Sequence, residues 1–332
     1  MKIGMFTAMQ WSEEERPDDV LRSLKDQVRA AREAGFGSLI IGQHLLTGPM
    51  GMFQTVPLMG ALAEEAKGMQ LGPGVLLLSM MNPVLAAEEG ATIDWLTDGN
   101  YVLCAGLGYR PEEFQAMGVD MKKRVGRLTE GVEIIKRLWT EKTVDFQGKH
   151  FTLDGAKPAV QPKQQPRPPI WLGGDVEASV RRAARLADAW CVAPTLSTES
   201  ILNYLSAFRE ERVANGLDPN VACPVIRECF VGRDKAHAEE ASRGPLMYKY
   251  QAYSSWGQGE TAGGDFAAGF GDFAKGRFII GDVEEAKDEI LRYAEITGTD
   301  HILLRFQWPG QEHSETLGNL SLIHISEPTR PY

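Results

Sequence analysis

The regular alternation of short apolar runs with segments of helical periodicity constrains the fold of this 332-residue chain more than any other feature. Eight runs have the length and apolar content of strands, and they are Lys2 to Thr7, Ser38 to Gly42, Leu71 to Leu78, Tyr101 to Ala105, Ile170 to Leu172, Ala189 to Ala193, Val225 to Val231 and His301 to Phe306. Short buried strands that alternate with helices are typical of a (β/α)8 barrel, in which the loops after the strands build the active site. The sequence therefore predicts an α/β fold of the TIM-barrel type.

An open, doubly wound sheet is the alternative architecture. It would need a G-x-G-x-x-G turn after the first strand, and the stretch FTAMQWSEEERP has no glycine. The segments Asp18 to Ala34 and Val283 to Thr297 have the periodicity of amphipathic helices, and a glycine follows each of them. This pattern suits helices that pack around the outside of a barrel.

Two stretches interrupt the alternation and predict insertions. After the fourth helix, Thr143 to Leu153 alternates with period two, which indicates a β-hairpin, and Lys157 to Pro169 is a proline-rich connector. Between strands seven and eight, Ser254 to Gly276 is rich in glycine and aromatic residues and is too long for an ordinary connection. We expect this second insertion to be either a surface loop or a lid over a ligand.

The C-terminal segment SLIHISEPTRPY, Ser321 to Tyr332, differs from the rest of the chain. It does not continue the helical pattern that QEHSETLGNL begins, and it resembles the translation of a sequencing adapter. We therefore expect one domain over residues 1–320, with its eighth helix cut short, and a non-native tail over residues 321–332.

Composition excludes several classes of function. The chain has 35 Lys and Arg against 45 Asp and Glu, and it lacks a basic block with interleaved aromatic residues, so nucleic acid is not an expected partner. No apolar run reaches the roughly 20 residues that span a bilayer, so we expect no membrane partner. Four cysteines without C-x-x-C or metal-ligand spacing indicate reduced core thiols and a cytoplasmic location, and they are Cys104, Cys191, Cys223 and Cys229.

His44 follows the second strand, on the side where a barrel carries its chemistry. An imidazole titrates near neutral pH, so His44 is a candidate general acid or base. A core or turn histidine satisfied by a neighbour is the alternative. A metal site is not predicted, because the first strand has no H-x-H and the chain has no H-E-x-x-H.

Glycines mark three other strand ends. Gly74 lies inside the third apolar run, where a glycine indicates a bulge, a kink or close approach of a ligand. Gly106 and Gly108 follow the fourth strand and could let a planar ligand lie against the backbone. Gly173 and Gly174 precede a helix whose first amide groups suit a phosphate, and a tight turn with Asp175 as the helix N-cap is the alternative.

Charged residues on the last two strands are also candidates for the barrel interior. Strand periodicity alone does not say which of Arg227, Glu228 and Arg305 face inward. Asp300 and His301 precede the eighth strand, so we expect them to be structural residues of the barrel floor.

Taken together, these segments resemble the bacterial-luciferase-like family of flavin-dependent oxidoreductases. The resemblance extends to about Leu320, and it rests on the ordered segments MKIGMFTA, GQH, LGPGVLLLSMMNPVLAAEEGATIDWLTDGNYVLCAGLGYRPEEFQAMG, RVGRLTEGVEIIKRLW, PPIWLGGDVEASVRRAARLADAW and LLRFQWPG. It implies a TIM barrel that binds a flavin, or a deazaflavin in a sister branch, at the C-terminal ends of the strands.

The resemblance also assigns residues to the cofactor and to catalysis. It implies that His44 transfers a proton near the flavin, and that Gly74 and Val75 bend the third strand against the ring, often through a cis peptide. The remaining cofactor-binding residues that it implies are Gly106, Leu107, Gly108 and Tyr109 at the ring or ribityl chain, and Gly173, Gly174, Asp175 and Val176 at the phosphate. This chain has Leu107 where bacterial luciferase has an arginine, and relatives often have serine at Asp175 and Val176.

The resemblance implies a two-component monooxygenase that uses reduced FMN, supplied by a separate NAD(P)H:flavin reductase, and oxygen on a small organic substrate. A deazaflavin (coenzyme F-420)-dependent hydride-transfer enzyme on the same barrel is the alternative. A non-catalytic flavin-binding member is a third reading, from another class of function. Dimerisation through the early helices is expected, as in relatives.

Overall fold

The computed structural model describes residues 1–257 and 271–326, and its core is a nearly closed parallel barrel. Eight strands follow one another around it in the order β5-β3-β1-β13-β11-β10-β9-β6, and a bridge between Leu71 and Tyr101 brings the two ends together. The strands are β1 (Lys2–Thr7), β3 (Ser38–Ile41), β5 (Gln70–Pro73), β6 (Leu103–Ala105), β9 (Ile170–Gly174), β10 (Ala189–Val192), β11 (Val225–Val231) and β13 (His301–Arg305). The predicted TIM-barrel fold is confirmed.

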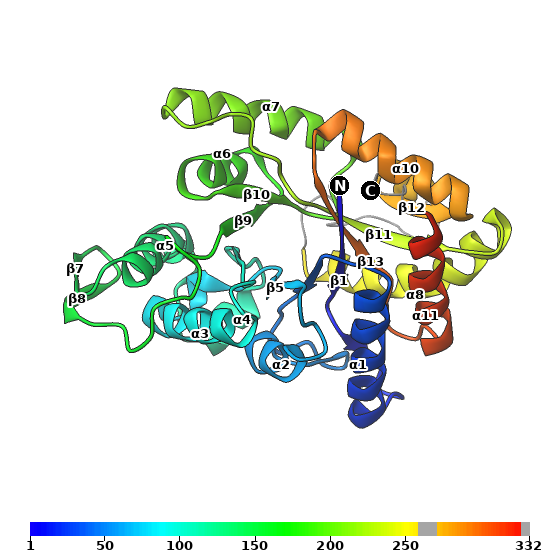
Figure 1. The fold of residues 1–332 in the computed structure, drawn as a ribbon, viewed down its shortest axis with the longest axis horizontal. Helices are drawn as coiled ribbons and strands as arrows, with labels where there is room; N and C mark the ends of the chain where they lie inside the picture. The colour runs from blue at the N-terminus through cyan, green and yellow to red at the C-terminus, as the bar shows by residue number, and fades with distance from the viewer. Residues whose placement is uncertain (258–270, 327–332) are drawn as a thin grey trace.

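Helices surround this barrel, as Figure 1 shows. They are α1 (Pro17–Glu33), α2 (Thr55–Leu62), α3 (Pro83–Leu96), α4 (Pro111–Ala116), α5 (Arg124–Thr140), α6 (Glu177–Leu186), α7 (Thr198–Ala214), α8 (Lys235–Ser255), α10 (Val283–Thr297) and α11 (His313–Ser326), with 3-10 turns at η1 (Leu78–Met80) and η2 (Met121–Lys123). Local signals fix their ends, because α10 begins with a capping box between Asp282 and Glu285 and ends at the left-handed Gly298. The two helices predicted from periodicity are confirmed to within one residue.

The third strand is shorter than predicted. The apolar run from Leu71 to Leu78 was expected to be one strand, but β5 ends at Pro73, and the peptide between Gly74 and Val75 is cis. Pairing with β6 resumes only at Leu76, whose amide donates to the Cys104 carbonyl at 2.8 Å. The run then enters η1, because a continuous apolar run suits a buried turn as well as a buried strand.

The connection between strands seven and eight contains an element that the sequence analysis missed. Strand β12 (Phe278–Gly281) pairs in parallel with the second half of β11, outside the barrel order. The predicted insertion from Ser254 to Gly276 starts inside α8, which extends to Ser255, and residues 258–270 lie outside the described part of the chain. Four residues of β12 were too few for a periodic signal.

The other insertion has the predicted form. Strands β7 (Val144–Gln147) and β8 (Thr152–Ala156) form an antiparallel hairpin that projects beyond α5 at one end of the molecule (Figure 1). A second small sheet joins β2 (Gln10–Trp11) to β4 (Gly51–Met52). It connects the loops after β1 and β3, beside the position of His44.

The helical pattern at the C-terminus continues further than expected. Helix α11 extends to Ser326, so the prediction that the helix does not continue beyond Leu320 is wrong. Leu320 and Ile323 are both buried, and this apolar contact explains why the helix continues through Ser321. Residues 327–332 lie outside the described part, and within that part no helix is long and apolar enough to cross a membrane.

Two of the predicted structural features, the buried cysteines and the structural His301, are present in the described part of the chain. All four cysteines are buried free thiols. His301 is buried between strands, where its Nε2 lies 2.8 Å from Ser38 Oγ and its ring contacts Trp171 edge to face. Burial, with a smaller contribution from Lys2, lowers the pKa of His301 to about 3 from an ordinary value of 6.5. The imidazole is therefore neutral in the folded protein at neutral pH.

We expect His301 to make folding stability fall as the pH decreases from 6.5 to about 3. In that range the unfolded chain binds a proton that the folded chain does not, so each pH unit removes up to about 1.4 kcal/mol of the free energy of unfolding. Urea unfolding of the protein and of His301→Gln between pH 7 and pH 4 tests this, because the variant should have a shallower slope. Parallel slopes would contradict the assignment.

Candidate active site

A cavity of about 380 Å³ lies at the C-terminal ends of the barrel strands. Its volume is in the range of small-molecule sites, which is roughly 300–1,000 Å³. All eleven residues predicted for catalysis or cofactor binding line it, and they are His44, Gly74, Val75, Gly106, Leu107, Gly108, Tyr109, Gly173, Gly174, Asp175 and Val176. The fold thus brings together residues that are up to 132 positions apart in sequence (176 minus 44).

One wall of the cavity is built from Val75 and the glycines beside it. A Cβ atom on Gly106 would lie 2.5 Å from Val75 Cγ2, and one on Gly173 would lie 2.6 Å from Val75 Cγ1. Both distances are far below van der Waals contact. Only glycine at these two positions lets the Val75 side chain occupy the space between β6 and β9, and the resulting wall suits a planar ligand.

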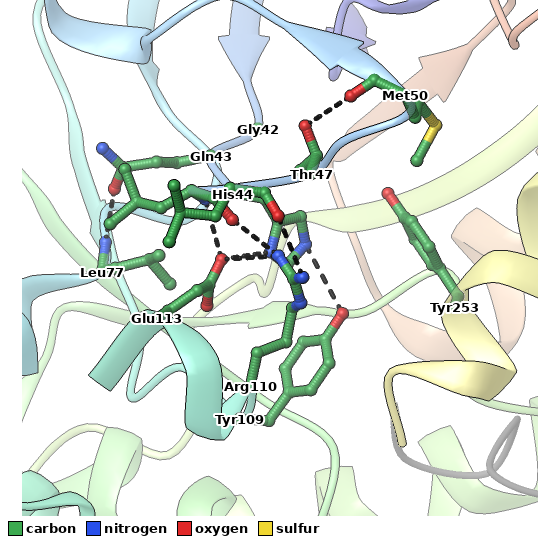
Figure 2. Close-up of polar contacts among 12 residues, drawn as sticks. Gly42, Gln43, His44, Thr47, Met50, Leu77, Tyr109, Arg110, Glu113 and Tyr253 are labelled. Atoms are coloured by element: carbon green, nitrogen blue, oxygen red, sulfur yellow. Dashed lines mark hydrogen bonds and ion pairs between the residues drawn. The ribbon is translucent and has the colours of Figure 1, made fainter. Parts of the chain in front are cut away.

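His44 enters the cavity from the loop after β3, and Figure 2 shows the Glu113 carboxylate beside its ring. The Nδ1 atom of His44 lies 3.1 Å from Oε1 of Glu113, which is completely buried at the start of α4. Since a carboxylate only accepts hydrogen bonds, Nδ1 carries the hydrogen in this pair. The Nε2 atom is then free of that hydrogen and available for proton transfer.

Arg110 balances the charge of Glu113 and fixes the loop that carries His44. Its Nη1 donates to the Leu45 carbonyl at 2.6 Å and lies 3.4 Å from Glu113 Oε1, while its Nη2 donates to the Leu46 carbonyl at 3.2 Å. The Leu45 amide also donates to Glu113 Oε1, at 2.8 Å (Figure 2). The loop after β3 is therefore tied to α4 by hydrogen bonds that all involve Arg110 or Glu113.

Aromatic side chains cover His44 on the cavity side. The Tyr109 hydroxyl lies 3.5 Å from His44 Nε2, and burial raises the pKa of Tyr109, so the phenol keeps its proton. The rings of Tyr253 and Trp256, at the end of α8, lie 6.0 and 5.4 Å from the His44 ring. Trp256 also stacks on the Arg110 guanidinium at 4.4 Å. These contacts limit the access of water to the imidazole.

The predicted phosphate end of the cavity differs in detail from the expectation. The alternative in which Asp175 is the N-cap of the following helix is wrong, because α6 begins at Glu177 and its N-cap is Val176. The reason is Ser179, whose Oγ donates to the Val176 carbonyl at 2.6 Å and accepts from the Val176 amide at 3.2 Å. Asp175 instead lies in the cavity wall.

Arg124, which sequence reasoning missed, supplies a positive charge to the cavity wall from the first residue of α5. Burial lowers the pKa of Arg182, and the nearby charges of Arg185 and Arg124 lower it further. No sequence signal identified Arg124, because nothing along the chain indicates that α5 begins beside α6.

The charged residues on the last strands divide between the two sides of the barrel. Arg305 lines the cavity, and Glu228 lies buried beside it. Arg227 was also a candidate for the interior, but it faces outward, where its guanidinium stacks on Tyr293 of α10 and donates to the Leu196 carbonyl. Adjacent residues of a strand point to opposite faces, which explains why Arg227 and Glu228 separate.

Fold and cavity define a TIM-barrel protein with a small-molecule site at the C-terminal ends of its strands, and the comparisons identify its family. Residues 1–300 match the model of the luciferase-like monooxygenase family, and the chain belongs to that family. It is 30% identical to the phthiodiolone/phenolphthiodiolone dimycocerosates ketoreductase of Mycobacterium kansasii, over 55% of this chain and 51% of the relative. The chain spans 51% to 61% of the length of the curated relatives that it matches.

Solved structures share the whole fold. Monooxygenase RslO1 from Streptomyces bottropensis matches with a TM-score of 0.85 and 21% identity, over 98% of each chain. An F-420-dependent secondary alcohol dehydrogenase, in complex with an F-420-acetone adduct, matches with a TM-score of 0.78 and 21% identity, over 99% of each chain. At these identities the similarity shows the fold.

We expect His44→Ala to lower turnover by about 10² to 10⁴-fold, the usual contribution of general acid–base catalysis. Glu113→Gln should also lower turnover, because a neutral amide accepts the Nδ1 hydrogen less strongly than a carboxylate does and so holds the ring less firmly. Turnover, cofactor affinity and the thermal midpoint are measured in parallel. Glu112→Gln is the matched control, since Glu112 is the exposed neighbour on α4.

Two results would contradict this assignment. Equal loss of turnover in Glu112→Gln and Glu113→Gln would show that burial of the carboxylate is unimportant. A large loss of folding stability in His44→Ala, with cofactor affinity lost as well, would make His44 a structural residue.

Proposed function

We propose that this protein is the oxygenating component of a two-component flavin monooxygenase, which uses reduced FMN and oxygen on a small organic substrate. The observation that carries the proposal is the contact of His44 with the buried Glu113 at a cavity that has one wall formed by Val75 and glycines. Bound reduced FMN would supply the electrons for oxygen activation. The residues of this chain supply binding, proton transfer and exclusion of water.

The cavity wall fits a flavin. The ring would lie against Val75, where Gly106 and Gly173 leave room that any side chain would fill. The phosphate would lie near Gly174 and Arg124, and Arg124 would supply the positive charge that is absent at Leu107. A charge-assisted hydrogen bond from arginine contributes about 1.5–3 kcal/mol, enough to offset the loss of one such contact elsewhere.

Within this cavity His44 would move a proton through Nε2. The Glu113 carboxylate would accept the Nδ1 hydrogen and hold the ring in its orientation, as the acidic partner of a catalytic histidine does. The Tyr109 hydroxyl, 3.5 Å from Nε2, lies where a proton could pass to or from the cavity. Tyr253 and Trp256 would keep bulk water from the reacting atoms.

A hydride-transfer enzyme that uses coenzyme F-420 is the second candidate. The ketoreductase relative favours it, as does the dehydrogenase whose structure is similar. In such an enzyme His44 and Glu113 would exchange a proton with an alcohol or carbonyl oxygen. A flavin-binding protein without turnover is a third proposal, and it would retain the cavity while losing proton transfer at His44.

The remaining parts of the proposal concern the domain, the source of reduced FMN, the oligomeric state and the cellular location. A single luciferase-like domain would cover residues 1–320. A separate NAD(P)H:flavin reductase would supply reduced FMN, and two copies of the chain would form a homodimer in the cytoplasm. These statements rest on the family resemblance.

Binding titrations and an oxygen electrode test the choice of cofactor. We expect reduced FMN to bind to the purified protein and oxygen uptake to exceed that of free reduced FMN, with His44→Ala altering uptake but not affinity. Coenzyme F-420 is titrated in the same way. Tight F-420 binding without any protein-dependent oxygen uptake would overturn the monooxygenase proposal in favour of hydride transfer, and binding of either cofactor without turnover would favour the third reading.

A further inference from the structure

Arg305 places a buried positive charge at the cavity, across the barrel from the predicted cofactor wall. It is the last residue of β13, it is only 1% exposed, and it lines the cavity. In the order of the barrel strands, β6 is the fourth strand from β13 in either direction. Arg305 therefore faces the glycines that follow β6 from the opposite side of the barrel.

The hydrogen bonds of Arg305 go to neutral oxygens. Its Nη2 donates to Gln10 Oε1 at 2.9 Å, and its Nε donates to the Gln307 carbonyl at 3.2 Å. Its Nε lies 3.9 Å from Glu228 Oε2, which is too long for a hydrogen bond. These bonds hold the guanidinium in place through Nε and Nη2, while Nη1 carries two further N–H donors.

Glu228 is already satisfied by other groups. Lys249 and Tyr250 of α8 both donate to its Oε1, the phenol at 3.0 Å, and the Trp308 indole donates to its Oε2. This buried cluster thus contains two basic side chains, Arg305 and Lys249, and one carboxylate. The carboxylate is bound mainly to Lys249, so the charge of Arg305 remains directed at the cavity.

Tyr253 adds a hydroxyl group beside the guanidinium. Its phenol donates to the same Gln10 Oε1 that accepts from Arg305, at 3.2 Å, and its ring lies 6.0 Å from the ring of His44. Tyr253 also lines the cavity. Arg305, Tyr253 and His44 consequently border the same space, whose other walls on this side are apolar at Phe6 and Ile226.

We propose that Arg305, with Tyr253 beside it, binds a carboxylate on the substrate, so that the enzyme acts on small molecules with an apolar body and one carboxylate. This inference rests on the proposed function, because it assumes that the cofactor occupies the wall of Val75, Gly106 and Gly173. Arg305 has an ion pair with Glu228 at 3.9 Å but no hydrogen bond to a carboxylate among the described residues. A substrate carboxylate would accept such a hydrogen bond from Nη1, and the guanidinium matches carboxylate geometry.

Binding of three matched probes to the protein without cofactor tests the proposal. Octanoate, octanamide and 1-octanol share one apolar chain and differ in the head group. Calorimetry should find octanoate bound at least about tenfold more tightly than the other two, the minimum expected of a charge-assisted hydrogen bond. Arg305→Gln should reduce this preference to about onefold, and Arg305→Lys should keep part of it.

Arg227→Gln is the matched control, because Arg227 is a buried arginine on the neighbouring strand that faces α10 instead of the cavity. It should keep the preference for octanoate. Equal binding of octanoate and octanamide by the unaltered protein, or a preference that survives Arg305→Gln, would overturn the proposal. Loss of FMN binding in a folded Arg305→Gln protein would also overturn it, by assigning Arg305 to the cofactor.

The result is separable from the proposed function. A carboxylate preference without protein-dependent oxygen uptake would retain the anion site and remove the monooxygenase. Oxygen uptake without a carboxylate preference would support the monooxygenase proposal and reject the carboxylate site at Arg305. If Arg305→Gln fails to fold, the probe preferences of the unaltered protein and of Arg305→Lys still decide, and the latter should keep part of the preference for octanoate while binding 1-octanol as before.

Discussion

The buried carboxylate of Glu113 holds together the segments that form the reacting side of the cavity. Its Oε1 receives the Leu45 amide, the His44 imidazole and the Arg110 guanidinium at 2.8, 3.1 and 3.4 Å. A carboxylate without partners would be costly to bury, by several kcal/mol. The three contacts offset that cost, and each also fixes a part of the loop after β3 or the start of α4. The orientation of His44 depends on this arrangement.

The barrel strands set the positions of the residues that line the cavity, and the loops after the strands carry the residues proposed for catalysis and cofactor binding. Parallel strands bring the ends of β3, β5, β6, β9 and β13 to one side of the molecule, so residues distant in sequence line a single cavity. The predicted cofactor wall consists of glycine backbone and Val75, while the opposite wall carries Arg305 and Tyr253. The cavity thus separates a flat surface suited to a ring from a charged surface suited to a substrate.

The sequence predicted the elements that have strong local signals. All eight barrel strands, the hairpin β7–β8 and the predicted lining residues were identified, because alternation, turn residues and glycine positions are local properties. Glu113 was missed because it follows Glu112 in sequence, and only the packing of α4 distinguishes the buried carboxylate from the exposed one. Arg124 was missed for the same reason. The positions of both side chains depend on contacts between distant segments, which a single sequence does not record.

The central claim is that the Glu113 carboxylate fixes the tautomer of His44. Nitrogen NMR of protein with ¹⁵N-labelled histidine tests it directly, with the His44 signal among the six histidines assigned from His44→Gln. We predict that neutral His44 carries its hydrogen on Nδ1, and that Glu113→Gln weakens this preference. Neutral His44 with its hydrogen on Nε2 in the unaltered protein would contradict the account.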